Sequence, residues 1–129
     1  MSDIDYILDL FDWNQSIENQ AKGLELAKNV KSINAFLQPG DEKHNKNVWD
    51  NCAKTLAERE DAVLKPYLYH LFGWLIDMNW PGAQIVFDRL EKYQDKEWFN
   101  IVLDMRIKQA KLLDEQIWLE NLLVFKETK

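Results

Sequence analysis

Hydrophobic residues spaced three and four positions apart recur along most of this sequence, while apolar and polar residues never alternate for more than a few positions. In residues 4–11, for example, Ile4, Ile7, Leu8 and Phe11 fall on one side of a helix with 3.6 residues per turn. Spacing of this kind is typical of amphipathic helices and not of strands. The pattern therefore predicts an all-α protein.

Breaks in the pattern divide the 129 residues into about seven or eight short helices joined by short links. We expect these helices near residues 4–11, 17–30, 46–58, 63–76, 85–90, 95–111 and 114–125, with a polar loop at 39–47. Helices this short do not fit a four-helix bundle, whose helices are longer. They favour one domain, residues 1–129, built as a right-handed αα superhelix, a HEAT-like stack of antiparallel helix pairs.

The stretch 63–76 is the most apolar part of the chain. A helix that is apolar nearly all round packs on more than one side, so we place it at the centre of the domain as one helix. Pro66 fits such a helix only near its first turn or at a kink. Farther along, Asp95 and Asp114 precede the last two apolar patterns, and we expect them to act as N-caps there.

The charge of the chain is −6, and the first 20 residues hold five acidic residues but no lysine or arginine. The five are Asp3, Asp5, Asp9, Asp12 and Glu18. An acidic surface repels the phosphates of nucleic acids and attracts basic proteins. We therefore expect no nucleic-acid binding, and either a basic protein partner or a solvated face that keeps the chain soluble.

The single cysteine, Cys52, cannot form an internal disulfide, which agrees with a reducing compartment. No apolar run approaches the roughly 18 residues that a membrane span needs, and acidic residues stand where a signal peptide carries basic ones. These features predict a cytoplasmic protein that does not bind membranes.

Enzyme motifs are missing from the sequence: it has no glycine-rich phosphate loop, no Gly-x-Ser-x-Gly, no His-Glu-x-x-His and no Cys-x-x-Cys. A nucleophile would have to be Cys52 with His44 or His70, but Cys52 falls on the apolar face of its helix, where a thiol is ordinarily inert. His70 and Asp77 lack a third metal ligand at a suitable spacing. We expect no enzyme activity, no cofactor and no metal, and a small enzyme is the least favoured alternative.

Four segments carry a resemblance to a known family: 65–68, which reads KPYL, 71–83, which reads LFGWLIDMNWPGA, 47–54, which reads NVWDNCAK, and 11–14, which reads FDWN. They resemble a family of small bacterial proteins of unknown function with a HEAT-like helical-repeat fold, in particular a Firmicutes branch. The resemblance implies a helical-repeat fold and no established catalytic residues. Some helical-repeat relatives are thought to be immunity proteins that neutralise a toxin, so it also implies an immunity role.

The segment Asn79, Trp80, Pro81 and Gly82 predicts a tight corner between two helices. Asn79 or Trp80 can cap the next helix, Pro81 can begin its first turn, and Gly82 allows close packing. This structural role explains the segment without any chemistry. The alternative is that Trp80 contacts a partner.

Helical-repeat stacks commonly recognise other proteins, so we predict a non-enzymatic protein-binding module, with an immunity protein against a basic toxin as the specific hypothesis. The candidate contacts are Asp3, Asp5, Asp9, Asp12, Tyr67, Tyr69 and Trp80. The alternative is a self-assembling scaffold, in which exposed aromatic residues pair between copies. We expect a monomer or a weak homodimer.

Overall fold

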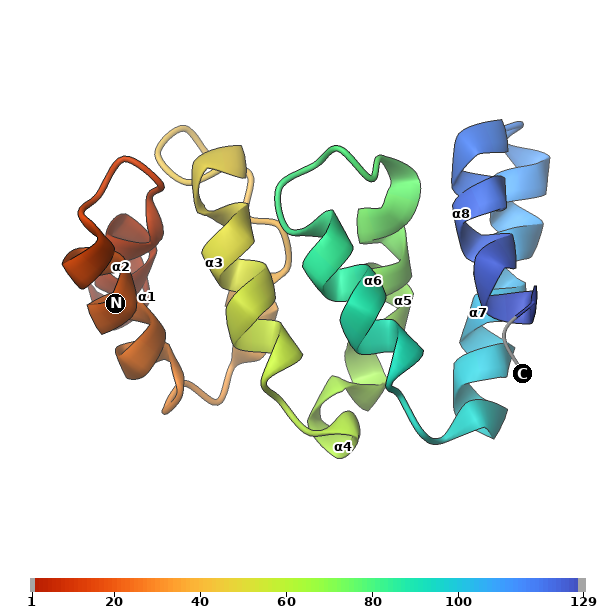
Figure 1. Ribbon diagram of the computed structural model, residues 1–129, viewed down its shortest axis with the longest axis horizontal. Helices are drawn as coiled ribbons and strands as arrows, with labels where there is room; N and C mark the ends of the chain where they lie inside the picture. The colour runs from red at the N-terminus through yellow and green to blue at the C-terminus, as the bar shows by residue number, and fades with distance from the viewer. Residues whose placement is uncertain (1, 128–129) are drawn as a thin grey trace.

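Every regular element in the computed structural model, which describes residues 2–127, is helical (Figure 1). The α-helices are α1 (Ser2–Phe11), α2 (Ile17–Ala27), α3 (Lys46–Ala57), α4 (Asp61–Leu64), α5 (Leu68–Gly73), α6 (Ala83–Glu91), α7 (Lys96–Leu112) and α8 (Gln116–Glu127). Three 3₁₀ turns accompany them, namely η1 (Ile33–Phe36), η2 (Lys65–Tyr67) and η3 (Trp74–Ile76). The prediction of an all-α protein is confirmed.

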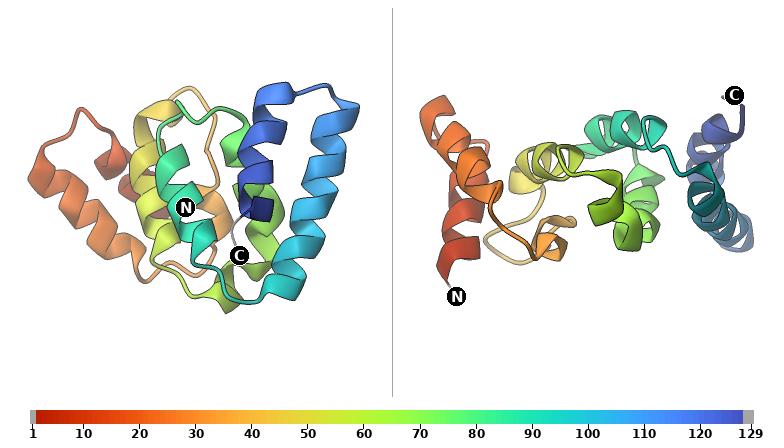
Figure 2. Two further views of the ribbon diagram at one scale, coloured as in Figure 1. Left: turned by 45° about the vertical axis from the view of Figure 1, so that its right-hand side comes forward. Right: turned by 90° about the horizontal axis from the view of Figure 1, so that it is seen from below.

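The helices stand side by side in a row, with α1 and α2 at one end and α7 and α8 at the other (Figures 1 and 2). Packing is mainly between neighbours: α1 packs on α2 and α3, α3 on α6, α5 on α7, and α7 on α8. Both ends of the row therefore have a side that no other helix of residues 2–127 covers. The HEAT-like class and the right-handed superhelix stay predictions.

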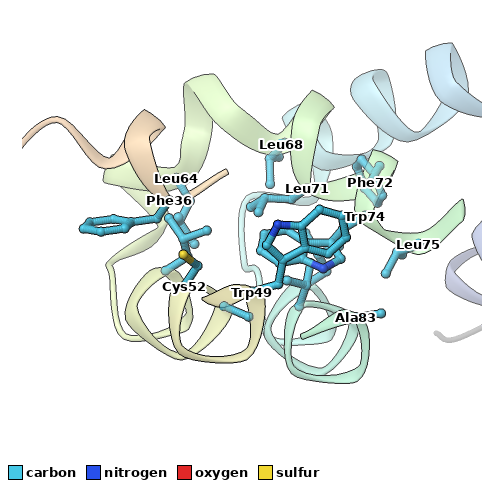
Figure 3. Close-up of a cluster of buried hydrophobic side chains, with 14 of the residues drawn as sticks. Phe36, Trp49, Cys52, Leu64, Leu68, Leu71, Phe72, Trp74, Leu75 and Ala83 are labelled. Carbon is cyan, nitrogen blue, oxygen red and sulfur yellow. The ribbon is translucent and has the colours of Figure 1, made fainter. Parts of the chain in front are cut away.

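The most apolar stretch is buried as expected, but it is not one helix. It is divided into α4, η2, α5 and η3, and the break coincides with Pro66 in η2. Proline has no N–H to donate and its ring clashes with the preceding turn, so the chain continues there as a tighter 3₁₀ turn. The prediction of a single helix at 63–76 was therefore wrong. The predicted place of this stretch in the core is correct, since its residues form much of the buried cluster in Figure 3.

Tryptophan side chains from one segment donate hydrogen bonds to backbone carbonyls of another. The pairs are Trp49 to Pro39 at 2.7 Å, Trp74 to Pro81 at 3.0 Å, Trp98 to Lys65 at 3.1 Å and Trp118 to Phe72 at 3.0 Å. Carbonyls at the ends of short helices and in the links need such donors, because they have no partner within their own helix. Each indole therefore fills space and also satisfies a polar group of a neighbouring element.

The corner before α6 is built differently from the prediction. Gly82, and neither Asn79 nor Trp80, is the N-cap of α6, and Pro81 precedes the helix without belonging to its first turn. Gly82 has a φ of 85°, in the left-handed region that favours glycine. A Cβ at this position would lie 2.8 Å from the Trp49 carbonyl oxygen, which leaves no room for a side chain.

The two predicted aspartate caps have different outcomes. Asp95 is the N-cap of α7, and its side chain accepts a hydrogen bond from the Trp98 amide at 3.3 Å. Asp114 is not a cap: it has a φ of 58° in the link between α7 and α8, and α8 begins only at Gln116.

None of the helices between residues 2 and 127 has the length and apolar character needed to cross a bilayer.

Substituting Gly82→Ala should lower the free energy of unfolding by about 2–4 kcal/mol, because the new Cβ meets both a left-handed backbone and the Trp49 carbonyl. The control is Gly40→Ala, where the nearest atom to the added Cβ is 4.0 Å away. We expect this control to change stability by less than about 0.5 kcal/mol. Urea denaturation measures both, and equal stability of the two variants would contradict the role given to Gly82.

Candidate protein-binding surfaces at the two ends of the row

Large exposed apolar side chains gather at the two ends of the row. Apart from Val63, they belong to α1, α2, α7, α8 or the links within these pairs: Tyr6, Trp13, Ile17, Leu26, Ile101, Met105, Leu112, Leu113, Ile117 and Val124. In stacks of helical repeats the terminal units ordinarily present a polar outer face, because nothing covers them. Exposed apolar patches on a folded protein mark interaction surfaces, so both ends are candidate binding surfaces.

The C-terminal end carries an apolar stripe along α7. Ile101, Met105 and Leu112 are 48, 50 and 77% exposed. Together with Lys108 they follow the spacing four, three, four, which places all four on one side of the helix. The opposite side of α7 is also apolar, but it is buried in the core. The outer stripe is therefore not needed to hold α7 in place.

A hollow of about 380 Å³ lies beside this stripe, between α5 with η3 and the corner that joins α7 to α8. It is lined by Tyr69, Ile76, Arg106, Gln109, Leu112, Leu113 and Trp118. Apolar residues with a few polar groups among them are the usual composition of a binding hollow. Leu112 belongs to both the hollow and the stripe, so the two adjoin at the C-terminal end of α7.

Arg106 is the charged group of the hollow. Its Nε donates to the Tyr69 carbonyl at 3.0 Å and its Nη1 to Gln109 Oε1 at 2.7 Å. The guanidinium carbon lies 3.7 Å from the centre of the Tyr69 ring and 4.9 Å from that of Trp118. Burial lowers the pKa of Arg106, yet a guanidinium keeps its charge at neutral pH.

Among residues 2–127, no carboxylate lies within ion-pair distance of Arg106, whose polar contacts are with Gln109 and with the backbone and side chain of Tyr69. Gly73 makes room for this side chain, since a Cβ there would lie 2.6 Å from Nη2. A half-buried cation without a counter-charge attracts a carboxylate, which guanidinium groups bind through paired hydrogen bonds. This feature makes the hollow suited to an acidic group.

The predicted aromatic contacts do not form one surface. Tyr69 lines the hollow, and its hydroxyl accepts a hydrogen bond from Gln109 at 2.8 Å. Tyr67 lies in η2, half-buried against the core. Trp80 is also half-buried and packs edge-on against Trp49, with ring centres 5.6 Å apart. A binding role for Tyr67 and Trp80 stays a prediction, and the packing of Trp80 favours its structural role.

The acidic residues of α1 and the link after it fall into two groups. Asp3 and Asp5 are exposed and form no ion pair within residues 2–127. Asp9 lies 2.8 Å from Nε2 of His44 and 3.1 Å from Nζ of Lys43. These contacts bind α1 to the 39–47 loop, so Asp9 has an internal structural role.

Asp12 also has internal partners. It accepts hydrogen bonds from the Asn14 amide and from Nδ2 of Asn47, both at 2.9 Å. The charge at this end therefore remains most available at Asp3, Asp5 and the exposed Glu18. Spacing in the sequence cannot distinguish carboxylates that form internal contacts from those that do not, because the loop that contacts Asp9 lies about 35 positions away.

The residues considered for catalysis are not gathered into a site. Cys52 is buried, and burial strongly raises the pKa of its thiol. His44 is only 4% exposed and contacts Asp9, while the exposed His70 packs edge-on against Tyr69. Within the described part of the chain, no three His, Cys, Asp or Glu residues are grouped so that they could hold a metal ion.

A second hollow, of about 730 Å³, lies between the α3–α4 link and α6. Arg89 lines it, but this residue already pairs with Asp61 and donates to the Arg59 carbonyl at 2.9 Å. Asp61 in turn accepts the Gln94 amide at 2.9 Å. Arg89 and Asp61 in this hollow thus satisfy one another, whereas Arg106 in the first hollow has no carboxylate partner within residues 2–127.

The sequence profile of the family described as Domain of unknown function (DUF5071) matches residues 41–127. This chain belongs to the DUF5071 family. No curated protein and no solved structure matches it. The part shared with DUF5071 runs from the polar loop through α8, so it contains the α7 stripe and the hollow, while α1 and α2 lie outside it. The expected kinship with a family of unknown function is confirmed.

Asp9→Asn should lower the free energy of unfolding by about 1 kcal/mol near neutral pH, because it weakens the contacts to His44 and Lys43. The hydrogen bond to His44 is the main cause that lowers the pKa of Asp9. A lowered carboxyl pKa stabilises the fold above the pKa of the unfolded chain, and this contribution disappears as the pH falls through the folded pKa. The difference from the unsubstituted protein should therefore shrink below about pH 4.

Asp5→Asn is the matched control, since Asp5 is on the same helix but exposed. We expect it to cost only a few tenths of a kcal/mol, from the loss of an acidic residue in the first turn. Thermal unfolding between pH 3 and 7 compares the variants. A loss for Asp9→Asn that stays the same across this range would argue against the charged contact.

Proposed function

We propose that this chain is a non-enzymatic protein-binding module whose main docking surface is the α7 stripe together with the Arg106 hollow. The observation that supports the proposal is the exposed apolar stripe of Ile101, Met105 and Leu112 beside a half-buried arginine without a counter-charge. The surface lies in the segment that the family shares, where a function common to its members would reside.

The energetics of association favour this surface over the rest of the molecule. Burying an exposed Leu, Ile or Met side chain contributes about 1.5–3 kcal/mol, and a few such anchors dominate most interfaces. Arginine is also enriched at the centre of interfaces, because its planar group both stacks and forms paired hydrogen bonds. Arg106 is already stacked on Tyr69 and fixed by two hydrogen bonds, so it loses little entropy when a carboxylate binds.

A more specific form of the proposal is an immunity protein that neutralises a toxin in the cytoplasm. A basic toxin would approach the acidic end first, where Asp3, Asp5 and Glu18 are exposed. Electrostatic attraction of this kind mainly speeds association and weakens as salt is added. Because α1 and α2 lie outside the segment shared by the family, this end suits contacts that are particular to one toxin.

The test is affinity capture from native cells with four baits, followed by quantitative mass spectrometry. The baits are the unsubstituted chain, Met105→Glu with Leu112→Glu, Asp3→Asn with Asp5→Asn, and Val63→Glu as a control on an exposed apolar residue away from both ends. We expect a specific protein whose recovery falls at least about tenfold with the first double variant, since charge would enter an apolar interface, and stays unchanged with the control.

If the partner is a basic toxin, its recovery should also fall with the bait that carries Asp3→Asn and Asp5→Asn. If the same proteins were recovered with all four baits, the proposed docking surface would be wrong. Circular dichroism and melting temperature show that each bait is folded, which is expected because every substituted residue is exposed.

A further inference from the structure

We propose that the partner of the C-terminal surface is a second copy of this chain, with the α1–α2 end of one copy docked on the α7 side of the next. This inference rests on the proposed function, since it names the occupant of the same surface. It follows from the distribution of apolar and charged side chains over the two ends of the row.

Helices α1 and α7 have opposite net charge. Helix α1 carries Asp3, Asp5 and Asp9 and no basic residue, and Asp12 follows directly after it. Helix α7 has more basic than acidic residues: Lys96, Arg106, Lys108 and Lys111 against Glu97 and Asp104. Contact between α1 of one copy and α7 of the next therefore brings unlike charges together.

Both ends also present apolar side chains among these charges. Tyr6 and Trp13 are exposed beside the acidic residues of α1, and Ile17 is exposed at the start of α2. On α7, Lys108 stands within the apolar stripe between Met105 and Leu112. The acidic α1 surface with its aromatic residues thus faces a stripe that carries Lys108 among aliphatic residues, and the two can bury their apolar parts while unlike charges pair at the rim.

Arg106 gives this contact a specific anchor. The guanidinium has no ion-pair partner, since no carboxylate of residues 2–127 reaches it. Asp3 and Asp5 are the exposed carboxylates of α1 that have no ion pair in the same part of the chain. One of them, from the next copy, supplies the counter-charge that the hollow lacks, and such a partly desolvated pair is stronger than a surface ion pair.

The positions of the two ends determine the kind of assembly. They lie at opposite ends of the row (Figures 1 and 2), so the contact joins two different surfaces and extends the row of helices. Head-to-tail contacts produce either an open chain of copies or a closed ring. A two-fold dimer through the α7 stripe would instead place Lys108 of each copy near Lys108 of the other, where like charges repel.

The experiment is sedimentation velocity with two variants that each block one end. Asp5→Lys with Ile17→Lys blocks the N-terminal end, and Met105→Glu with Leu112→Glu blocks the C-terminal end; all four residues are exposed. The unsubstituted chain should grow beyond a dimer as its concentration rises from about 10 to 500 μM at low salt, in the range of weak interfaces. Each variant alone should stay a monomer.

The decisive sample is an equimolar mixture of the two variants. Each variant keeps the end that the other has lost, so the mixture should form a one-to-one dimer and nothing larger. Its dissociation constant should rise about tenfold when salt is raised from about 50 to 500 mM, because the contact pairs exposed charges. The Val63→Glu control should associate like the unsubstituted chain.

Three results would overturn this inference: an unsubstituted chain that remains a monomer, a mixture that does not associate, or an N-terminal variant that still dimerises by itself, which would indicate a two-fold contact.

The capture experiment distinguishes a failure of this inference from a failure of the proposed function. If the chain is a monomer and captures a foreign protein only when Met105 and Leu112 are intact, the proposed docking surface is supported and the proposal of a second copy as partner is wrong. A monomer that captures nothing would overturn both.

Discussion

The supply of hydrogen-bond donors to backbone carbonyls at helix ends and in the links is the constraint on which the rest of this structure depends. Short helices have many carbonyls without a partner in their own helix, because the last four of each are unpaired whatever its length. Here the indoles of Trp49, Trp74, Trp98 and Trp118 reach carbonyls of other segments. The guanidinium of Arg59 does the same for Ala27 and Lys28 at the end of α2. The bonds from Trp98, Trp118 and Arg59, whose partners lie more than 30 positions away, help to fix how one helix pair lies on the next.

The same arrangement explains why the ends differ from the middle. An inner element such as α3 is covered on both sides, by α1 and by α6, and its apolar residues are buried. At each end of the row one side has no neighbour, and there the exposed apolar residues collect. Arginine side chains also join elements of the row. Arg59 and Arg89 donate to backbone carbonyls of other segments, and Arg106 donates to the Tyr69 carbonyl of α5, beside the hollow at the end of the row.

The class of the fold could be predicted from the sequence, because the three-and-four spacing of apolar residues depends only on the geometry of one helix. The N-cap Asp95 was found for the same local reason. Features that depend on distant residues were missed. Gly82 is required because Trp49 lies against it, and the charged contact of Asp9 involves a loop far along the chain. Arg106 in a helix is indistinguishable from a solvated surface residue unless the space left by Gly73 is known.

The arrangement of helix pairs in a row has a consequence for how the molecule opens. Where each unit contacts mainly its neighbours, stability is close to a sum of unit and interface contributions, and local unfolding begins where an interface is missing. The end pairs should therefore exchange their amide hydrogens faster than α3 and α6 at the centre. A partner that covers an end adds the missing interface, so the binding site is also the place where the fold gains most from being occupied.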